Sequence, residues 1–180
     1  LILKSVEMRI LQISDTHNRH QLLTDLPSAE VLIHCGDFTD IGTEQEVLDF
    51  LNWFIELPYS YKLFVTGNHD LCLWDAEILE DLPSNVFFLQ DRGCHVDGTK
   101  FFGLGYNHQE NLIPTDVDIL ITHEPPMMIL DESGGTHWGK PAFAQSNRRG
   151  KTSISYFWTC PRIVWHSTAR EDHFLEWLCS

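Results

Sequence analysis

The sequence predicts an α/β fold, and three observations carry that prediction. Short apolar runs rich in β-branched residues each end abruptly at a polar residue, which is typical of buried strands. One stretch of helical periodicity separates two of these runs, and a strand, a helix and a strand in that order imply a right-handed parallel crossover. The composition is globular, with 43% hydrophobic and 21% charged residues.

Four of the runs are expected to form buried strands that lead directly into a polar side chain. They cover residues 9–14, 31–36, 62–67 and 118–122. The polar residues that follow them are Asp15, Asp37, Asn68 and His123. Glycine precedes both Asp37 and Asn68, which lets the backbone turn sharply so that these side chains reach the crevice beyond the strands.

The segments between these runs supply one helix and further strands. Residues 43–57 carry apolar side chains at helical spacing, and Pro58 follows as a stop signal. Shorter strands bounded by glycine turns are expected at 86–89, 94–96 and 100–103, and we expect these three to form a second sheet.

Size and composition exclude several classes of protein. The 180 residues suffice for one domain with a sizeable core, and Met8 is the expected natural start. No apolar run approaches the ~20 residues that span a bilayer, so we expect a soluble protein. Five cysteines without a CxxC pair favour a reducing cytoplasm. A net charge of −14 argues against nucleic acid as a partner.

The charge is unevenly distributed along the chain. Residues 1–139 hold 6 Lys and Arg against 23 Asp and Glu, whereas residues 140–180 hold 6 against 3. This break divides the chain into residues 1–142, which carry the motifs, and an atypical tail of residues 143–180 that we expect to pack on the same domain.

Polar residues at the strand ends predict a metal site. Because ligands in open α/β sheets bind beyond the carboxyl ends of the strands, we expect the four segments to converge at one edge. Carboxylate, imidazole and amide donors without thiolate suit Mn, Fe or Zn. Several carboxylates and histidines indicate two ions, which together clamp the attacking and leaving oxygens of a displacement at phosphorus.

These motifs, Asp15-x-His17, Gly36-Asp37, Gly67-Asn-His-Asp70 and His123, resemble those of the calcineurin-like metallophosphoesterase family. Residues 8–139 carry the match, and the four motifs occur in the family's order. The local context resembles the branch related to class III cyclic-nucleotide phosphodiesterases. The resemblance implies a four-layer αββα sandwich and hydrolysis of a small phosphodiester or phosphomonoester, with a hydroxide between two divalent metal ions as nucleophile.

The resemblance also implies a role for each motif residue. The implied metal ligands are Asp15, His17, Asp37, Asn68 and His123. In this resemblance Asp15 and His17 bind the first ion, Asn68 and His123 bind the second, and Asp37 bridges the two. His69 is expected to contact the phosphate and protonate the leaving oxygen, and Asp70 is expected to hold the His69 ring in place.

The family's closing G-H-x-H motif is absent from the chain. We hypothesise that residues from roughly Phe143 onward are translated out of frame. Shifting by one base turns Trp158 and the first base of Thr159 into a glycine codon, and the following codons can then spell His-x-His. Sequencing the gene tests this hypothesis, because codons for Thr159 and Pro161 without A in the third position would end it.

Other interpretations of the same residues stay open. An aspartate after a strand often caps a helix, and His34, inside an apolar strand, is expected to be a core residue. A non-catalytic scaffold that keeps the fold is the alternative function, since the closing motif is missing. A nuclease is disfavoured by the acidic charge. Exposed sheet edges would favour pairing with a second copy of the chain or with another partner.

Overall fold

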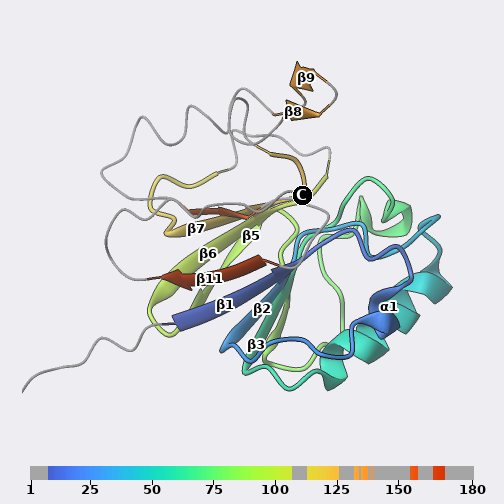
Figure 1. The fold of residues 1–180 in the computed structure, drawn as a ribbon, viewed down its shortest axis with the longest axis horizontal. Coiled ribbons are helices and arrows are strands. Elements are labelled where there is room, and N and C mark those ends of the chain that lie inside the picture. Colours follow the sequence, from blue (N-terminus) through green and yellow to red (C-terminus); the bar gives the residue numbers. More distant parts are fainter. Residues whose placement is uncertain are drawn as a thin grey trace, which may run out of the picture.

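The computed structural model describes residues 8–106, 113–125, 132–133, 135–137, 139, 155–157 and 164–168. Two sheets form the centre of this part of the chain (Figure 1). In the first sheet the strand order is β11-β1-β2-β3-β4. Its strands are β1 (Met8–Ile13), β2 (Val31–His34), β3 (Tyr61–Phe64), β4 (Val86–Phe88) and β11 (Val164–Thr168). Strands β1 to β4 are parallel, and β11 pairs antiparallel with β1.

The second sheet has the order β10-β7-β6-β5. Its strands are β5 (Arg92–Val96), β6 (Thr99–Leu104), β7 (Ile119–Thr122) and β10 (Ser155–Phe157). Strand β7 runs parallel to both β6 and β10, while β5 and β6 form an antiparallel pair. A separate hairpin joins β8 (Glu132–Ser133) to β9 (Thr136–His137).

The helix α1 (Glu44–Glu56) lies where helical spacing predicted it. It begins with a capping box, in which the Thr43 hydroxyl accepts from the Glu46 backbone N–H and the Glu46 carboxylate accepts from the Thr43 N–H. Single 3₁₀ turns, η1 (His20–Leu22) and η2 (Leu71–Leu73), follow two of the predicted site motifs.

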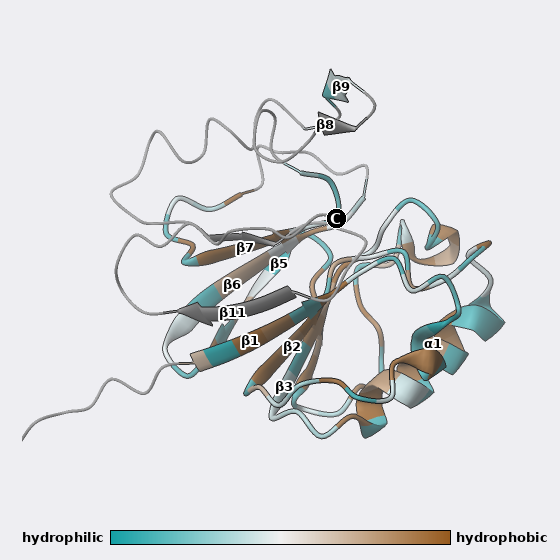
Figure 2. Cartoon of the chain, in the orientation of Figure 1, coloured by the Kyte–Doolittle hydropathy of each residue, from teal (hydrophilic) through white to brown (hydrophobic). Residues whose placement is uncertain are grey.

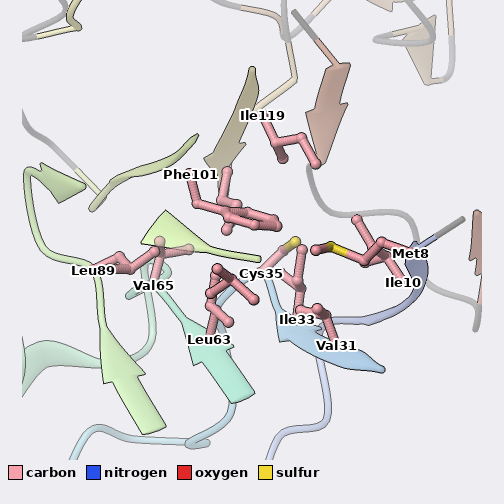
Figure 3. Packing of buried hydrophobic residues seen from close by; sticks show 12 residues of the cluster. Met8, Ile10, Val31, Ile33, Cys35, Leu63, Val65, Leu89, Phe101 and Ile119 are labelled. Carbon is pink, nitrogen blue, oxygen red and sulfur yellow. The ribbon is translucent and has the colours of Figure 1, made fainter. Parts of the chain in front are cut away.

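Side chains alternate between two apolar layers on either side of the first sheet. Ile10, Ile33 and Leu63 face the second sheet, where they pack with Phe101 and Ile119 (Figure 3). The opposite face of the first sheet packs against α1. This second cluster includes the fully buried residues Leu11, Leu32, Phe50, Phe54 and Phe64. Figure 2 shows the apolar side of α1 turned toward the sheet.

Three of the expected four layers lie within the described residues: α1, the first sheet and the second sheet. A third apolar cluster, of Phe102, Leu104, Val117 and Leu120, covers the far face of the second sheet. Among the described residues, no helix combines the length and the apolar character needed to cross a membrane.

Two sheet assignments made from the sequence were wrong. Residues 86–88 do not join the second sheet but extend the first, because the chain after β3 returns to pair parallel with it. Strand β7, expected beside the first three strands, belongs to the second sheet. The tail also supplies β11, which pairs with β1, and β10, which pairs with β7.

Candidate metal centre

All the predicted metal ligands come together, but at the ends of two sheets rather than at one edge. Asp15 and Asp37 follow β1 and β2, and Asn68 follows β3, all in the first sheet. His123 directly follows β7 of the second sheet. The site therefore lies where the carboxyl ends of both sheets meet.

The loops that carry the ligands have an unusual backbone. Asp15, His17 and Asp37 adopt positive φ angles of 53°, 39° and 56°. The two loops are tied together, since the Asp15 N–H donates to the Gly36 carbonyl and the His17 N–H to the Asp37 carbonyl, each at 3.0 Å. Left-handed non-glycine residues are strained and cluster at functional sites. Their presence here supports a functional role for these loops.

Two glycines allow the close approach of the loops. Gly36 has a φ of 97°, and a Cβ there would lie 2.6 Å from the Gly67 nitrogen and 2.7 Å from His123 Nδ1. Gly67 has no positive φ, but a Cβ on it would lie 2.5 Å from the Asp37 nitrogen. The expected sharp turn therefore holds for Gly36, whereas Gly67 serves close packing.

Potential metal-binding atoms form two groups that share Asp37. The deep group consists of Asp15, Asp37 and His123, and the outer group of His17, Asp37 and His69, with ligand atoms within 4.8 Å of one another in each. Asp15 thus groups with His123, whereas the resemblance assigned it to the same ion as His17. In the deep group His123 Nε2 lies 3.5 Å from Asp37 Oδ2 and 2.9 Å from Asn68 Oδ1. In the outer group His17 Nε2 lies 3.8 Å from the same Asp37 oxygen.

The three histidines of these groups are held in the same way. Each places Nδ1 against a backbone carbonyl: His17 on Thr39 at 3.2 Å, His69 on Asp40 at 2.6 Å and His123 on Cys35 at 2.9 Å. Metal-binding histidines characteristically donate their second N–H to such a carbonyl, which leaves Nε2 of His17 and of His123 free for an ion. The donor set therefore fits divalent cations.

Asp15 supports the same conclusion from a different observation. Its Oδ2 is buried without a hydrogen-bond partner. Burial raises the pKa of the Asp15 carboxyl, chiefly because the charged form is desolvated. A buried, unsatisfied carboxylate oxygen is costly unless a cation or a donor compensates it, and a metal ion in the deep group would do so.

Asp70 has a different role from the one the sequence predicted. The Asp40 carbonyl, not the Asp70 carboxylate, contacts the His69 ring. The buried Asp70 carboxylate instead accepts from the backbone N–H groups of Asp37, Thr39 and Gly67 at 2.8–3.0 Å. Burial raises the pKa of Asp70, and the hydrogen bonds from Gly67 and Thr39 oppose the rise. Asp70 thus fixes the two ligand loops to each other rather than orienting the His69 ring.

Sequence reasoning missed the groups that hold the rings. Thr39 and Asp40 act through their carbonyls, which carry no side-chain signal. Glu46 is the last residue of a T-x-x-E capping box, which the sequence shows, but its contact with Asn18, 28 residues away, is visible only in the fold. His34 was predicted correctly as a core residue, since it is fully buried and contacts the Thr16 hydroxyl at 3.0 Å.

The frameshift hypothesis concerns residues that are largely outside the described part. Residues 158–163, which include Thr159 and Pro161, are not described, and the tail contributes only the backbone of β10 and β11. The hypothesis stays a prediction.

Comparison with known proteins places the chain in a family. The model of the calcineurin-like phosphoesterase family matches residues 8–155. UPF0046 protein K07C11.7 of Caenorhabditis elegans is 36% identical over 163 residues, which cover 73% of this chain and 56% of that protein. Human metallophosphoesterase domain-containing protein 1 is 37% identical over 165 residues, covering 68% and 50%. The chain spans about half the length of these curated relatives. It belongs to the calcineurin-like phosphoesterase family.

Proposed function

We propose that the chain is a metal-dependent phosphoesterase that hydrolyses small phosphodiesters or phosphomonoesters with two divalent ions, Mn, Fe or Zn. The observation that carries the proposal is the pair of ligand groups that share Asp37. A carboxylate between two cations offsets their mutual repulsion. Family membership supports the general activity.

Each ligand group contributes in a distinct way to this chemistry. Two bound ions would clamp the attacking and leaving oxygens of an in-line displacement at phosphorus. Asp37 would contact both ions, Asp15, Asn68 and His123 would hold the deep one, and His17 the outer one. The donor atoms of these residues already face one another, so little reorganisation is needed on binding.

His69 is the candidate proton donor to the leaving oxygen. The hydrogen bond to the Asp40 carbonyl raises the pKa of His69, and the charges of Asp37 and Asp40 act in the same direction. A raised pKa keeps the imidazolium protonated to higher pH, and its Nε2–H is then available for the ester oxygen. The ring is half-buried, so a substrate can reach it.

Hydrolysis of bis(p-nitrophenyl) phosphate and p-nitrophenyl phosphate with added Mn²⁺ tests the proposal. Asp37→Asn should lower the rate by more than about 100-fold. Removing a residue that only positions a metal ligand already costs about 10- to 100-fold, and Asp37 would itself bind both ions. The matched control is Asp75→Asn, because the Asp75 carboxylate is exposed in the connection between β3 and β4. This variant should hydrolyse both esters at the wild-type rate. Equal rates for wild type and Asp37→Asn would contradict the proposal.

A non-catalytic scaffold is the second candidate function. The absence of G-H-x-H from the sequence favours it, because in the family that the site motifs resemble this motif supplies further metal ligands. Metal content distinguishes the two functions. A scaffold should bind Mn²⁺ below stoichiometry, whereas a phosphoesterase should bind close to two ions per chain and turn over substrate.

A further inference from the structure

The two rings of the outer group rest on one short segment. His17 Nδ1 contacts the Thr39 carbonyl at 3.2 Å, and His69 Nδ1 contacts the carbonyl of the next residue, Asp40, at 2.6 Å. We call residues 39–43, which run from this point to the start of α1, the strap. Because both rings contact consecutive carbonyls of the strap, a shift of its backbone would reorient both rings relative to Asp37.

The Glu46 carboxylate holds the strap along its length. Its Oε1 accepts from the N–H groups of Asp40 and Ile41 at 3.4 and 3.3 Å, and its Oε2 accepts from the Thr43 N–H at 2.8 Å and the Thr43 hydroxyl at 3.0 Å. The Asn18 side-chain amide, from the loop after His17, also donates to Oε1. One side chain therefore joins the helix, the strap and the loop of the outer ligand.

These contacts exceed what capping of the helix requires. A capping box needs only the reciprocal bonds between Thr43 and Glu46, whereas the bonds to Oε1 from Asn18, Asp40 and Ile41 serve the strap and the loop. Although burial opposes ionisation, hydrogen bonds from Thr43 and Asn18 lower the pKa of Glu46 to about 2. The carboxylate is therefore charged at neutral pH and accepts at both oxygens.

Asp70 secures the other end of the strap. Its carboxylate accepts from the Thr39 N–H at 3.0 Å and from the Thr39 hydroxyl at 2.8 Å. Asp70 also binds the Asp37 and Gly67 amides, so its loss would disturb the ligand loops directly. Glu46 touches none of the predicted ligands, which makes it the cleaner residue for testing what the strap does.

We propose that Glu46 is a positioning residue for the metal centre. Glu46 fixes the strap, and the Thr39 and Asp40 carbonyls of the strap in turn orient the His17 and His69 rings toward Asp37. The inference rests on the proposed function for its meaning in catalysis, but the orientation of the rings can be measured without turnover. Groups that hold metal-binding side chains in place change metal affinity or activity by about 10- to 100-fold when removed.

Glu46→Gln is the direct test, with Glu44→Gln as the matched control. Glutamine can still close the capping box through one oxygen, but its amide N–H₂ must then face the Asp40 and Ile41 donors, so the strap loses its acceptor. Glu44 lies in the same first turn of α1, is exposed and carries the same charge. Glu46→Asp is a second variant that keeps the charge and shortens the reach.

The measurements are Mn²⁺ affinity by calorimetry, long-range ¹H–¹⁵N spectra of the histidine rings in the metal-free chain, and kcat and KM. We expect Glu46→Gln to weaken Mn²⁺ binding about 10-fold or more and to shift the His17 and His69 ring signals. We expect kcat to fall more than KM rises, Glu46→Asp to show a smaller effect of the same sign, and Glu44→Gln to match wild type.

Two results would overturn the inference. One is wild-type affinity and wild-type ring signals in folded Glu46→Gln. The other, if that variant does not fold, is a Glu46→Asp variant with unchanged ring signals and affinity. A wild-type chain that binds Mn²⁺ but hydrolyses neither ester would count against the proposed function alone, because the ring signals and affinities still test Glu46.

Discussion

The deep and outer ligand groups differ in burial and in origin. The His123 side chain of the deep group is 7% exposed, whereas the His17 side chain of the outer group is 31% exposed. The deep group takes ligands from both sheets, and the outer group takes all three from loops of the first sheet. One half of the site therefore depends on how the sheets pack, and the other on how loops are held.

This difference predicts unequal metal sites. Buried ligands interact more strongly with a cation because little water screens them. A cation in the deep group would also link the first sheet to His123 of the second, so its binding would stabilise the packing of the sheets. The outer group offers a more solvated site whose geometry depends on the strap.

The largest expected effect separates the two groups by mutation. His123→Ala should raise the dissociation constant of the tighter Mn²⁺ ion by more than about 100-fold, equivalent to about 2.7 kcal/mol. It should also abolish most of the rise in melting temperature that Mn²⁺ produces. His17→Ala should remove only the weaker ion. Calorimetric titration and thermal unfolding with and without Mn²⁺ measure both effects, and identical behaviour of the two variants would refute the distinction.

Gly36→Ala should destabilise the fold at the junction of the deep group. The added Cβ would meet the Gly67 backbone nitrogen at 2.6 Å, and the φ of 97° is unfavourable for alanine. Strain and overpacking together should lower the free energy of unfolding by about 3 kcal/mol or more. Gly98→Ala is the control, because its φ is 85° but nothing lies within 4 Å, so about 1 kcal/mol is expected. Urea unfolding compares them, and equal losses would mean that the close approach is unimportant.

A smaller effect concerns acid and the support beneath the deep group. His34 is fully buried and its Nδ1 accepts from the Gly36 N–H at 3.3 Å. Burial lowers the pKa of His34 to about 3. In the unfolded chain His34 binds a proton as the pH falls below about 6.5, whereas in the folded chain it does so only near pH 3. The free energy of unfolding therefore decreases as the pH falls from about 6.5 to about 3. One such group contributes up to about 1.4 kcal/mol per pH unit.

Replacing His34 tests this sign. His34→Gln should flatten the dependence of the free energy of unfolding on pH between pH 6 and 4, although His20, whose pKa burial also lowers, leaves a remaining slope of the same sign. A wild-type slope in His34→Gln would show that this histidine does not carry the effect.

The sequence predicted individual elements better than their arrangement in sheets. The helix after Thr43 and the strands before Asp15 and Asp37 follow from hydrophobic periodicity and from the glycine, proline or polar residues that end each run, which are local properties. The sheet to which a strand belongs depends on pairing across the core. For that reason residues 86–88 and 119–122 were assigned to the wrong sheets.

The same division applies to the site. Asp15, Asp37 and His123 were found because each follows a strand and has a side chain that binds metal. Asp70 was identified, but its partners turned out to be backbone amides rather than a ring. The carbonyls of Thr39 and Asp40 could not be found, because any residue type supplies a carbonyl and only the fold shows where it points.

A crystal structure of the chain soaked with Mn²⁺, with anomalous scattering used to locate the ions, tests the central claim most directly. We expect two manganese peaks, one within bonding distance of Asp15 and His123 and the other within bonding distance of His17, with the Asp37 carboxylate between them. A single peak, or two peaks that do not share Asp37, would contradict it.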